Sequence, residues 1–270
     1  MDASVLGSSR QHLSHGLILR CKRCQFGFRS LRSNEAELAQ LYRQMDTAVY
    51  ESEEECRQRT AARHLGIVQR YVTQGRLLDV GCASGLFLQE AQKAGWSVVG
   101  IEPSIGLYQK AAVLLGERGQ LFCDTLEYAP LDSSSFEAIT LWDVLEHVPN
   151  PVASLCRCCR LLKPGGFLFT NVPDLDSLQA RILGKRWPLL LAEHLNYFNR
   201  NSLRLCGMKA GLTLIRFSRR RVDFSIEYVM YRMAQHGIRG ARTAHAVARK
   251  VGGRISMPVA LGETWGVWTK

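Results

Sequence analysis

The sequence predicts an α/β fold in which a doubly wound, mostly parallel sheet of seven strands has helices on both faces and an antiparallel last strand. Three observations lead to this prediction. The stretch Arg76–Gly85 joins a short apolar run to two glycines, as a buried strand does where it ends in a ligand-binding loop. Strand-like and helix-like patterns then alternate along the chain. The end of the chain, Glu263–Lys270, alternates apolar and polar residues, which suits the last, antiparallel strand.

The composition of this 270-residue chain suits one large α/β domain with an appendage, because 46% of its residues are hydrophobic and 22% are charged. No apolar run approaches the roughly 20 residues that span a bilayer. Met1–Arg20 has no continuous apolar core, so we expect no signal peptide. Nine cysteines, an odd number, favour a reduced protein over a disulfide framework. We therefore expect a cytoplasmic protein without a membrane span.

The chain is basic, with a formal net charge of +11 that is concentrated after Arg216. A basic face attracts phosphorylated substrates, nucleic acid or anionic lipid, although a solvated positive surface is the simpler interpretation. No aromatic-interleaved RNA motif accompanies the charges. We therefore expect no nucleic-acid partner, and an anionic small molecule remains compatible with the charge.

Two cysteines near the N-terminus have the spacing of a metal-binding knuckle. Cys21 and Cys24 lie between short apolar runs, which is typical of one half of a zinc ribbon. A ribbon needs four ligands, and only five residues separate the upstream candidates His12 and His15 from Cys21. That is short for the hairpin that joins two knuckles. We expect a partial zinc-ribbon-like segment and linker at 1–50, and no metal site.

The polar stretch Glu51–Thr60 then predicts a linker, and Ala61–Val72 has the apolar spacing of a helix that leads into the first strand.

The glycine loop after the first strand has the pattern D-x-G-x-x-x-G, beginning at Asp79. Gly81 and Gly85 lack a Cβ, so the chain can turn sharply there and a cofactor can lie against the backbone. Ser84 is predicted to cap the helix that follows, whose N-terminal N–H groups face the same cleft. The dinucleotide pattern G-x-G-x-x-G is absent, because position 83 is Ala83.

The next two strands each end on an acidic residue. Trp96–Glu102 is apolar up to Glu102, which lies 21 positions after Gly81. A carboxylate at this place can accept both ribose hydroxyls of an adenosine. Leu121–Asp124 reads as the third strand and ends on Asp124.

The remaining elements follow from apolar periodicity and from turn residues. In chain order they are a strand at Phe136–Leu141, a helix at Pro151–Leu162, a turn at Lys163–Gly166, a strand at Phe167–Val172, a helix at Asp176–Gly184, a helix at Ser202–Ala210, a strand at Leu212–Phe217, an amphipathic segment at Phe224–Ala234 and a surface helix within Gly237–Gly253. The apolar run Arg186–Phe198 carries His194 and Tyr197, which are one helical turn apart if this run is a helix.

The chain resembles the class I S-adenosylmethionine-dependent methyltransferases, and in particular small-molecule enzymes with an N-terminal ribbon. The motifs that carry the resemblance are the DVGCASG loop, FEAITLWDVLEHVPNP, LLKPGGFLFTNVPD and the E-H-L-x-x-F that ends at Phe198. The resemblance implies a Rossmann-like fold and S-adenosyl-L-methionine as the cofactor. It also implies a methyltransferase domain at 51–270, with a lid or acceptor insertion at about 173–200.

The resemblance further implies which residues form the site. His194 and Tyr197 are the preferred acid–base pair for the acceptor, although both could instead fix the lid by hydrogen bonds. His147 would face the cleft, either as a catalytic group or as a group that positions its loop. The implied cofactor-binding residues are Asp79, Gly81, Cys82, Gly85, Glu102, Pro103, Asp124, Thr125 and Trp142.

The sequence therefore predicts a methyltransferase that acts on a small-molecule acceptor, by O- or C-methylation, with an anionic or nucleotide-linked metabolite as a plausible acceptor. The cofactor carries its own leaving group, so no metal is required. An NAD-dependent oxidoreductase is disfavoured by Ala83 and by the lack of a Tyr-x-x-x-Lys pair. A non-catalytic cofactor-binding or scaffold protein is the alternative.

Overall fold

The protein is described here from a computed structural model, which places residues 3–7, 17–30, 54–191, 193–219, 221–227, 229–230, 240–251 and 256–270. His12 and His15, the candidate upstream ligands of the ribbon-like segment, lie outside these residues.

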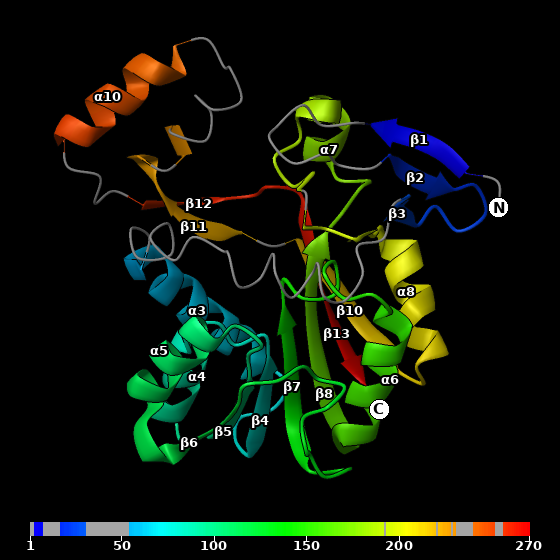
Figure 1. Ribbon diagram of the computed structural model, residues 1–270, viewed down its shortest axis with the longest axis vertical. Coiled ribbons are helices and arrows are strands. Elements are labelled where there is room, and N and C mark those ends of the chain that lie inside the picture. The colour runs from blue at the N-terminus through cyan, green and yellow to red at the C-terminus, as the bar shows by residue number, and fades with distance from the viewer. Residues whose placement is uncertain are drawn as a thin grey trace.

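A seven-stranded sheet forms the centre of the molecule (Figure 1). From one edge to the other its strands are β10 (Thr213–Arg219), β13 (Glu263–Thr269), β8 (Leu162–Pro173), β7 (Phe136–Trp142), β4 (Arg76–Val80), β5 (Ser97–Ile101) and β6 (Gly119–Phe122). The strands from β8 to β6 are parallel, and β13 runs antiparallel to both β8 and β10. The predicted fold class is confirmed. The chain order reverses at β4, between β7 and β5, and a ligand site is expected beyond the carboxyl ends of strands at such a point.

Helices cover both faces of this sheet (Figure 1). On one face lie α3 (Glu54–Val68), α4 (Leu86–Lys93) and α5 (Ile105–Leu115), with the short helical turn η1 (Gly116–Arg118) after α5; on the other lie α6 (Pro151–Leu161) and α8 (Arg200–Lys209). Neighbouring residues of β4 enter opposite cores, since Leu77 packs in the layer with α3 and α4, and Leu78 in the layer with α6 and α8. This is why the strand reads as a continuous apolar run.

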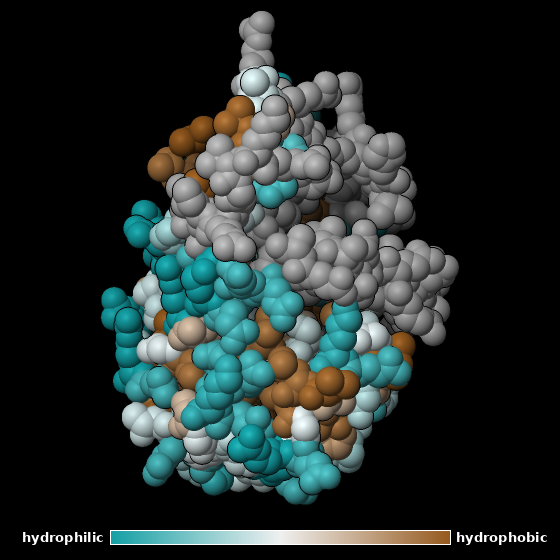
Figure 2. Space-filling model, turned by 90° about the vertical axis from the view of Figure 1, so that its left-hand side faces the viewer, coloured by the Kyte–Doolittle hydropathy of each residue, from teal (hydrophilic) through white to brown (hydrophobic). Residues whose placement is uncertain are grey.

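The outer surface of the α3–α5 layer faces the viewer in the lower half of Figure 2 and is largely hydrophilic, with an apolar group among the polar side chains. Ile105 and Val113 are exposed apolar residues of α5. Among the described residues, no helix is long and apolar enough to cross a bilayer.

A second, smaller sheet joins the N-terminal segment to the insertion that follows β8. Its strand order is β1 (Ala3–Gly7), β2 (Ile18–Cys21), β3 (Gly27–Arg29) and β9 (Asn196–Tyr197). The insertion also contains α7 (Leu178–Leu183) and a helical turn η2 (Gly184–Arg186), which stand at the upper end of Figure 1. Cys21 and Cys24 lie at the β2–β3 turn as free thiols.

Three local predictions between Glu51 and Gly166 are wrong. The predicted linker is helical from Glu54, because Cys56 and Thr60 already face the core. Ser84 is not the cap of α4; Gly85 occupies that position with φ = 84°. The expected turn at Lys163–Gly166 lies within β8, where a shift in the β7–β8 register accommodates it.

Farther along the chain, the predicted amphipathic segment begins in a strand. Phe224 lies in β11 (Val222–Ser225), which pairs with β12 (Ser256–Val259) in a separate two-stranded sheet. The side chain of Arg63 from α3 forms an ion pair with Asp223 at 3.0 Å, which ties β11 to the helical layer. The surface helix expected within Gly237–Gly253 is present as α10 (Ala241–Val251).

Candidate functional site

The loop between β4 and α4 requires glycine at its first bend. Gly81 has φ = 70°, a conformation that side chains with a Cβ rarely adopt. A Cβ built on Gly81 would lie 2.9 Å from Cγ2 of Val144, which belongs to the loop after β7. The backbone N–H groups of Gly81 and Cys82 donate to the Ile101 carbonyl at 2.8 and 3.0 Å. The loop is therefore bent closely over the end of β5.

Cys82 contributes backbone rather than a side chain to this loop. Its side chain is buried in the core, where a Cβ on Gly100 would lie 2.8 Å from its Sγ. Burial raises the pKa of the Cys82 thiol well above its usual range, so the sulfur stays protonated.

Glu102, just after β5, binds the glycine loop. Its Oε2 accepts a hydrogen bond from the Ala83 backbone N–H at 2.9 Å, and its Oε1 accepts one from the Ser104 N–H at 2.8 Å. Burial raises the pKa of Glu102, while these two hydrogen bonds oppose the shift. An ionised carboxylate has about four acceptor positions. Glu102 can therefore hold the loop and still accept hydrogen bonds from a ligand's hydroxyl pair.

Asp79 is the buried carboxyl group beneath the same loop. Thr140 on β7 donates from Oγ1 to Asp79 Oδ1 at 2.6 Å. Burial raises the pKa of Asp79 to about 7; the Thr140 hydrogen bond lowers it, and the charge of Glu102 raises it further. At neutral pH this carboxyl group is thus poised between its two protonation states.

The third predicted acid lies just beyond β6, at the same edge of the sheet. Asp124 is half-buried and accepts a hydrogen bond from the Thr125 backbone N–H at 2.7 Å. Thr125 is exposed, as is Pro103, which follows Glu102. The structure thus brings the predicted cofactor residues to the carboxyl ends of four adjacent strands, β7, β4, β5 and β6.

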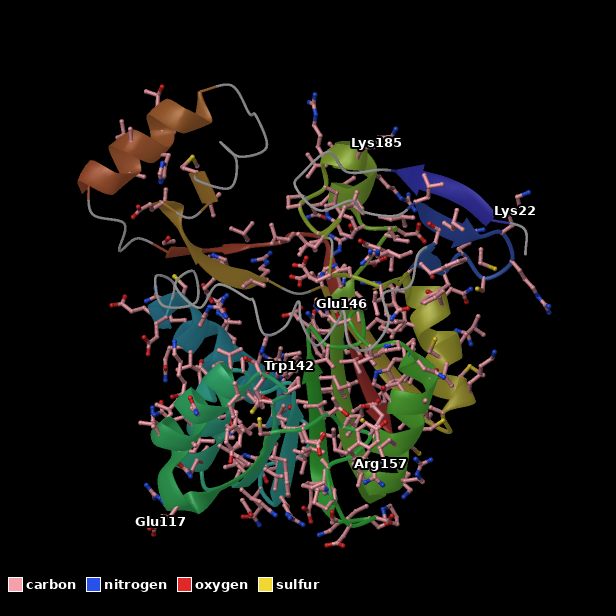
Figure 3. The ribbon with its side chains drawn as sticks, in the orientation of Figure 1. Lys22, Glu117, Trp142, Glu146, Arg157 and Lys185 are labelled. Atoms are coloured by element: carbon pink, nitrogen blue, oxygen red, sulfur yellow. The ribbon has the colours of Figure 1, made fainter. Side chains whose placement is uncertain are left out.

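An aromatic cluster closes the β7 side of this edge. Trp142, labelled in Figure 3 at the upper end of the sheet, stacks on His64 of α3 with ring centroids 4.1 Å apart. Phe87 of α4 meets the Trp142 ring edge-on at 5.8 Å. No local motif marks His64 in the sequence, because it is a lone histidine on an amphipathic helix.

The predicted acid–base pair does not lie on a helix. Tyr197 belongs to β9, and its OH donates to the Leu191 carbonyl at 3.0 Å. His194, which is 4% exposed, hydrogen-bonds through Nδ1 to the Leu189 carbonyl at 3.0 Å. The two rings are nevertheless adjacent, with centroids 5.9 Å apart. The helical spacing is therefore a wrong prediction, although the proximity that it predicted is present.

His147 joins this pair from the loop after β7. Its ring centroid lies 4.7 Å from that of His194, and its Nδ1 hydrogen-bonds to the Glu193 carbonyl at 3.2 Å. Burial lowers the pKa of His147, and the nearby Glu193 opposes the shift. A carbonyl oxygen can only accept, so Nδ1 carries the hydrogen in both imidazoles and Nε2 is the basic atom.

Glu146, labelled in Figure 3 below the insertion, completes a buried polar cluster that no sequence motif indicates. Potential ligand atoms of Glu146, His147 and His194 all lie within 4.8 Å of one another. A carboxylate and two imidazoles are suitable ligands for a metal ion, and among the described residues these three side chains are the group that is close enough together to bind one. From the sequence, no metal ligands were predicted here.

A doubly wound sheet with a glycine loop after one strand and a carboxylate at the tip of the next defines a domain that binds an adenosine-containing cofactor. Comparison with known proteins identifies the family. The model of a methyltransferase-domain family matches residues 50–216, which is more than half of the chain. The chain belongs to this methyltransferase-domain family.

The individual proteins that are similar to this chain are also named as methyltransferases. The ubiquinone biosynthesis O-methyltransferase of Thiobacillus denitrificans is 35% identical over 106 residues, covering 38% of this chain and 46% of that protein. The enzyme of the same name from Xanthomonas oryzae is 39% identical over 101 residues, covering 36% and 42%. The chain thus matches less than half the length of these relatives. A SAM-dependent methyltransferase of Thermotoga maritima superimposes with a TM-score of 0.57 at 19% identity, covering 86% of this chain and 99% of that chain.

S-adenosylmethionine is the cofactor of this domain, and the site fits it. A Cβ on Gly81 would clash with Val144, so the backbone of the loop stays bare at this bend, and Glu102 offers acceptor positions for a hydroxyl pair.

The Glu102 carboxylate is expected to contribute strongly to cofactor binding. Glu102→Gln keeps the shape of the side chain but removes its charge, so affinity for S-adenosylmethionine should fall by roughly 1–3 kcal/mol, the scale of a hydrogen bond to a charged group. Calorimetric titration measures this directly. Glu117→Gln is the matched control, because Glu117 is exposed at the opposite end of the sheet (Figure 3). Equal affinities in the two variants would contradict the assignment.

Proposed function

We propose that this protein transfers a methyl group from S-adenosylmethionine to a hydroxyl oxygen of a small-molecule acceptor. The proposal rests on one observation. The Glu102 carboxylate binds the glycine loop at the carboxyl edge of the sheet, where Asp79 and Trp142 also lie. The cofactor, when bound, supplies the methyl group together with its leaving group. The names of the relatives favour an oxygen acceptor over carbon.

In this proposal the chain's own residues hold the reactants and accept one proton. Gly81 and Glu102 position the cofactor, and the insertion at about 173–200 covers the acceptor. His194 takes the acceptor's proton on Nε2, since its Nδ1 is bonded to Leu189. We assign Tyr197 and His147 to holding the insertion, because each is hydrogen-bonded to one of its carbonyl groups.

We place the methyltransferase domain at 51–270. We assign 1–50 to a ribbon-like appendage, and the strand β3 within it supports this by pairing with β9 of the insertion. The net charge of +11 favours an anionic acceptor. All nine cysteines are free, in keeping with a reducing compartment such as the cytoplasm.

The experiment that tests the function is calorimetric titration of the protein with S-adenosylmethionine, S-adenosylhomocysteine and NAD. Binding of both adenosyl ligands and not of NAD supports the proposal. Hydroxylated small molecules are then screened as acceptors by release of S-adenosylhomocysteine. A folded sample that binds neither adenosyl ligand would instead favour a scaffold.

Cofactor binding is expected to release protons near neutral pH. The cofactor carries a sulfonium and an ammonium group, and both favour the ionised form of Asp79, whose pKa is about 7 without ligand. Below pH 7 the carboxyl group must lose its proton on binding, so affinity should rise about tenfold between pH 6 and pH 8. Titration in buffers of different ionisation enthalpy counts the protons. In Asp79→Asn the pH dependence should disappear; if it persists, another group is responsible.

A further inference from the structure

The insertion carries an exposed apolar tip. We define the α7 tip as Leu178–Arg186, comprising α7 and the turn that follows. Leu178 is 64% exposed, Ile182 72% and Leu183 38%. Leu178 and Ile182 are four residues apart on the helix, so both side chains lie on one side of it. Three large apolar side chains are thus exposed within nine residues at one end of the molecule. Such a group differs from apolar residues that are scattered singly over a surface.

Basic residues surround these apolar side chains. Arg181, Lys185 and Arg186 are all exposed, and no acidic residue occurs between Ser177 and Trp187. Lys185 stands at the upper end of the molecule in Figure 3. Exposed apolar groups interleaved with cationic ones are the composition of segments that lie in the interface of an anionic bilayer.

Hydrogen bonds at both ends hold the α7 tip in place, so its apolar side chains are exposed in the folded structure. Ser177 caps α7, its Oγ accepting from the Ala180 N–H at 3.1 Å. Gln179 donates to the Ala260 carbonyl at 3.0 Å. Trp187 is buried, and its Nε1 donates to the Leu261 carbonyl at 2.7 Å. Both ends of the tip are thus anchored on the segment that leads into β13.

The α7 tip lies at the same end of the central sheet as the candidate site. Trp187 begins the apolar run that continues to His194 and β9, and α7 lies above the carboxyl edge of the central sheet, on which Trp142 and Glu146 are found (Figure 3). A surface in contact with the α7 tip would therefore be next to the segment that covers the acceptor.

We propose that the α7 tip docks the protein on anionic lipid, so that the acceptor is taken from the bilayer interface. Leu178, Ile182 and Leu183 enter the acyl boundary, and the three cations lie at the headgroups. Nucleic acid would match the charge but offers no apolar phase for these side chains. The docking is a binding property that is measured without turnover; only the source of the acceptor rests on the proposed function.

The test is co-sedimentation of the full chain with vesicles of phosphatidylcholine, alone or mixed with phosphatidylglycerol. The wild-type protein should bind the anionic vesicles and bind the neutral ones weakly. The double variant Leu178→Ser/Ile182→Ser should lose at least about tenfold in partition coefficient, because two apolar side chains no longer enter the bilayer. Lys185→Glu should lose roughly 30-fold, because it changes the charge by two and each charge near the surface contributes about 1 kcal/mol.

The matched control is Val113→Ser, which removes an 87% exposed apolar side chain from α5, on the opposite side of the molecule. It should leave vesicle binding unchanged. Affinity for S-adenosylmethionine should be the same in all variants, which shows that they fold and separates this test from that of the reaction.

Three outcomes would overturn the proposal. The first is vesicle binding that the double variant leaves intact. The second is binding that responds to Lys185→Glu and to salt but not to the apolar substitutions, which is surface attraction alone. The third is no vesicle binding, with a mass by light scattering that falls in the double variant, since the tip would then join two copies of the chain.

Discussion

Gly81→Val should abolish measurable binding of S-adenosylmethionine, with a loss of at least about 100-fold in affinity. Two causes act together. The valine side chain would enter the space that we assign to the cofactor, and its Cβ would lie 2.9 Å from Val144, so the loop must move. The φ of 70° adds backbone strain for any residue with a Cβ. Titration calorimetry of the folded variant is the measurement.

A second glycine separates the loss of the binding site from general damage. Gly95 also has a positive φ, of 88°, but a Cβ there would meet nothing within 4 Å. Gly95→Val therefore carries the backbone strain without obstructing the site, and it should bind the cofactor as the wild-type protein does. If Gly81→Val also binds normally, the glycine loop is not the cofactor site.

His194→Ala should slow turnover by roughly 10²–10⁴ while leaving cofactor affinity unchanged, if His194 Nε2 accepts the acceptor's proton. The expectation rests on its Nδ1 hydrogen bond to Leu189, which leaves Nε2 as the basic atom beside His147. Single-turnover rates, measured together with calorimetric cofactor binding, separate the two effects.

Tyr197→Phe is the comparison for His194. The hydroxyl of Tyr197 donates to the Leu191 carbonyl, and burial raises the pKa of this phenol above its usual range. Its removal should cost about 1 kcal/mol of unfolding free energy and change turnover only a few-fold. Equal losses of turnover in the two variants would make both residues supports of the insertion, and normal turnover in His194→Ala would remove it from the chemistry.

The local sequence predicted the structure well where a strand and the loop that follows it depend mainly on neighbouring residues. The run before Asp79 and the positions of Gly81 and Gly85 were enough to place the first strand and its bend, because both faces of that strand are buried and the bend needs residues without a Cβ. The acids at Glu102 and Asp124 then follow from the regular alternation of strand and helix.

Helix boundaries and the insertion were predicted less well. The helical start at Glu54 depends on Cys56 and Thr60, which are buried only because α3 packs against α4 and β11. The segment with His194 and Tyr197 is extended, because its backbone pairs with Gly27 and Phe28 from the N-terminal segment. No local pattern contains that partner.

The sequence by itself therefore determined the class of fold, the glycine loop and the acids at the strand ends, since each depends on burial and backbone geometry within a few consecutive residues. Tertiary structure decided which distant groups meet. His64 stacks on Trp142, and His147 meets His194, across separations in the chain that no periodicity spans. Such contacts form only when the sheet brings the ends of β4 and β7 together beneath the insertion, because they depend on how whole elements pack.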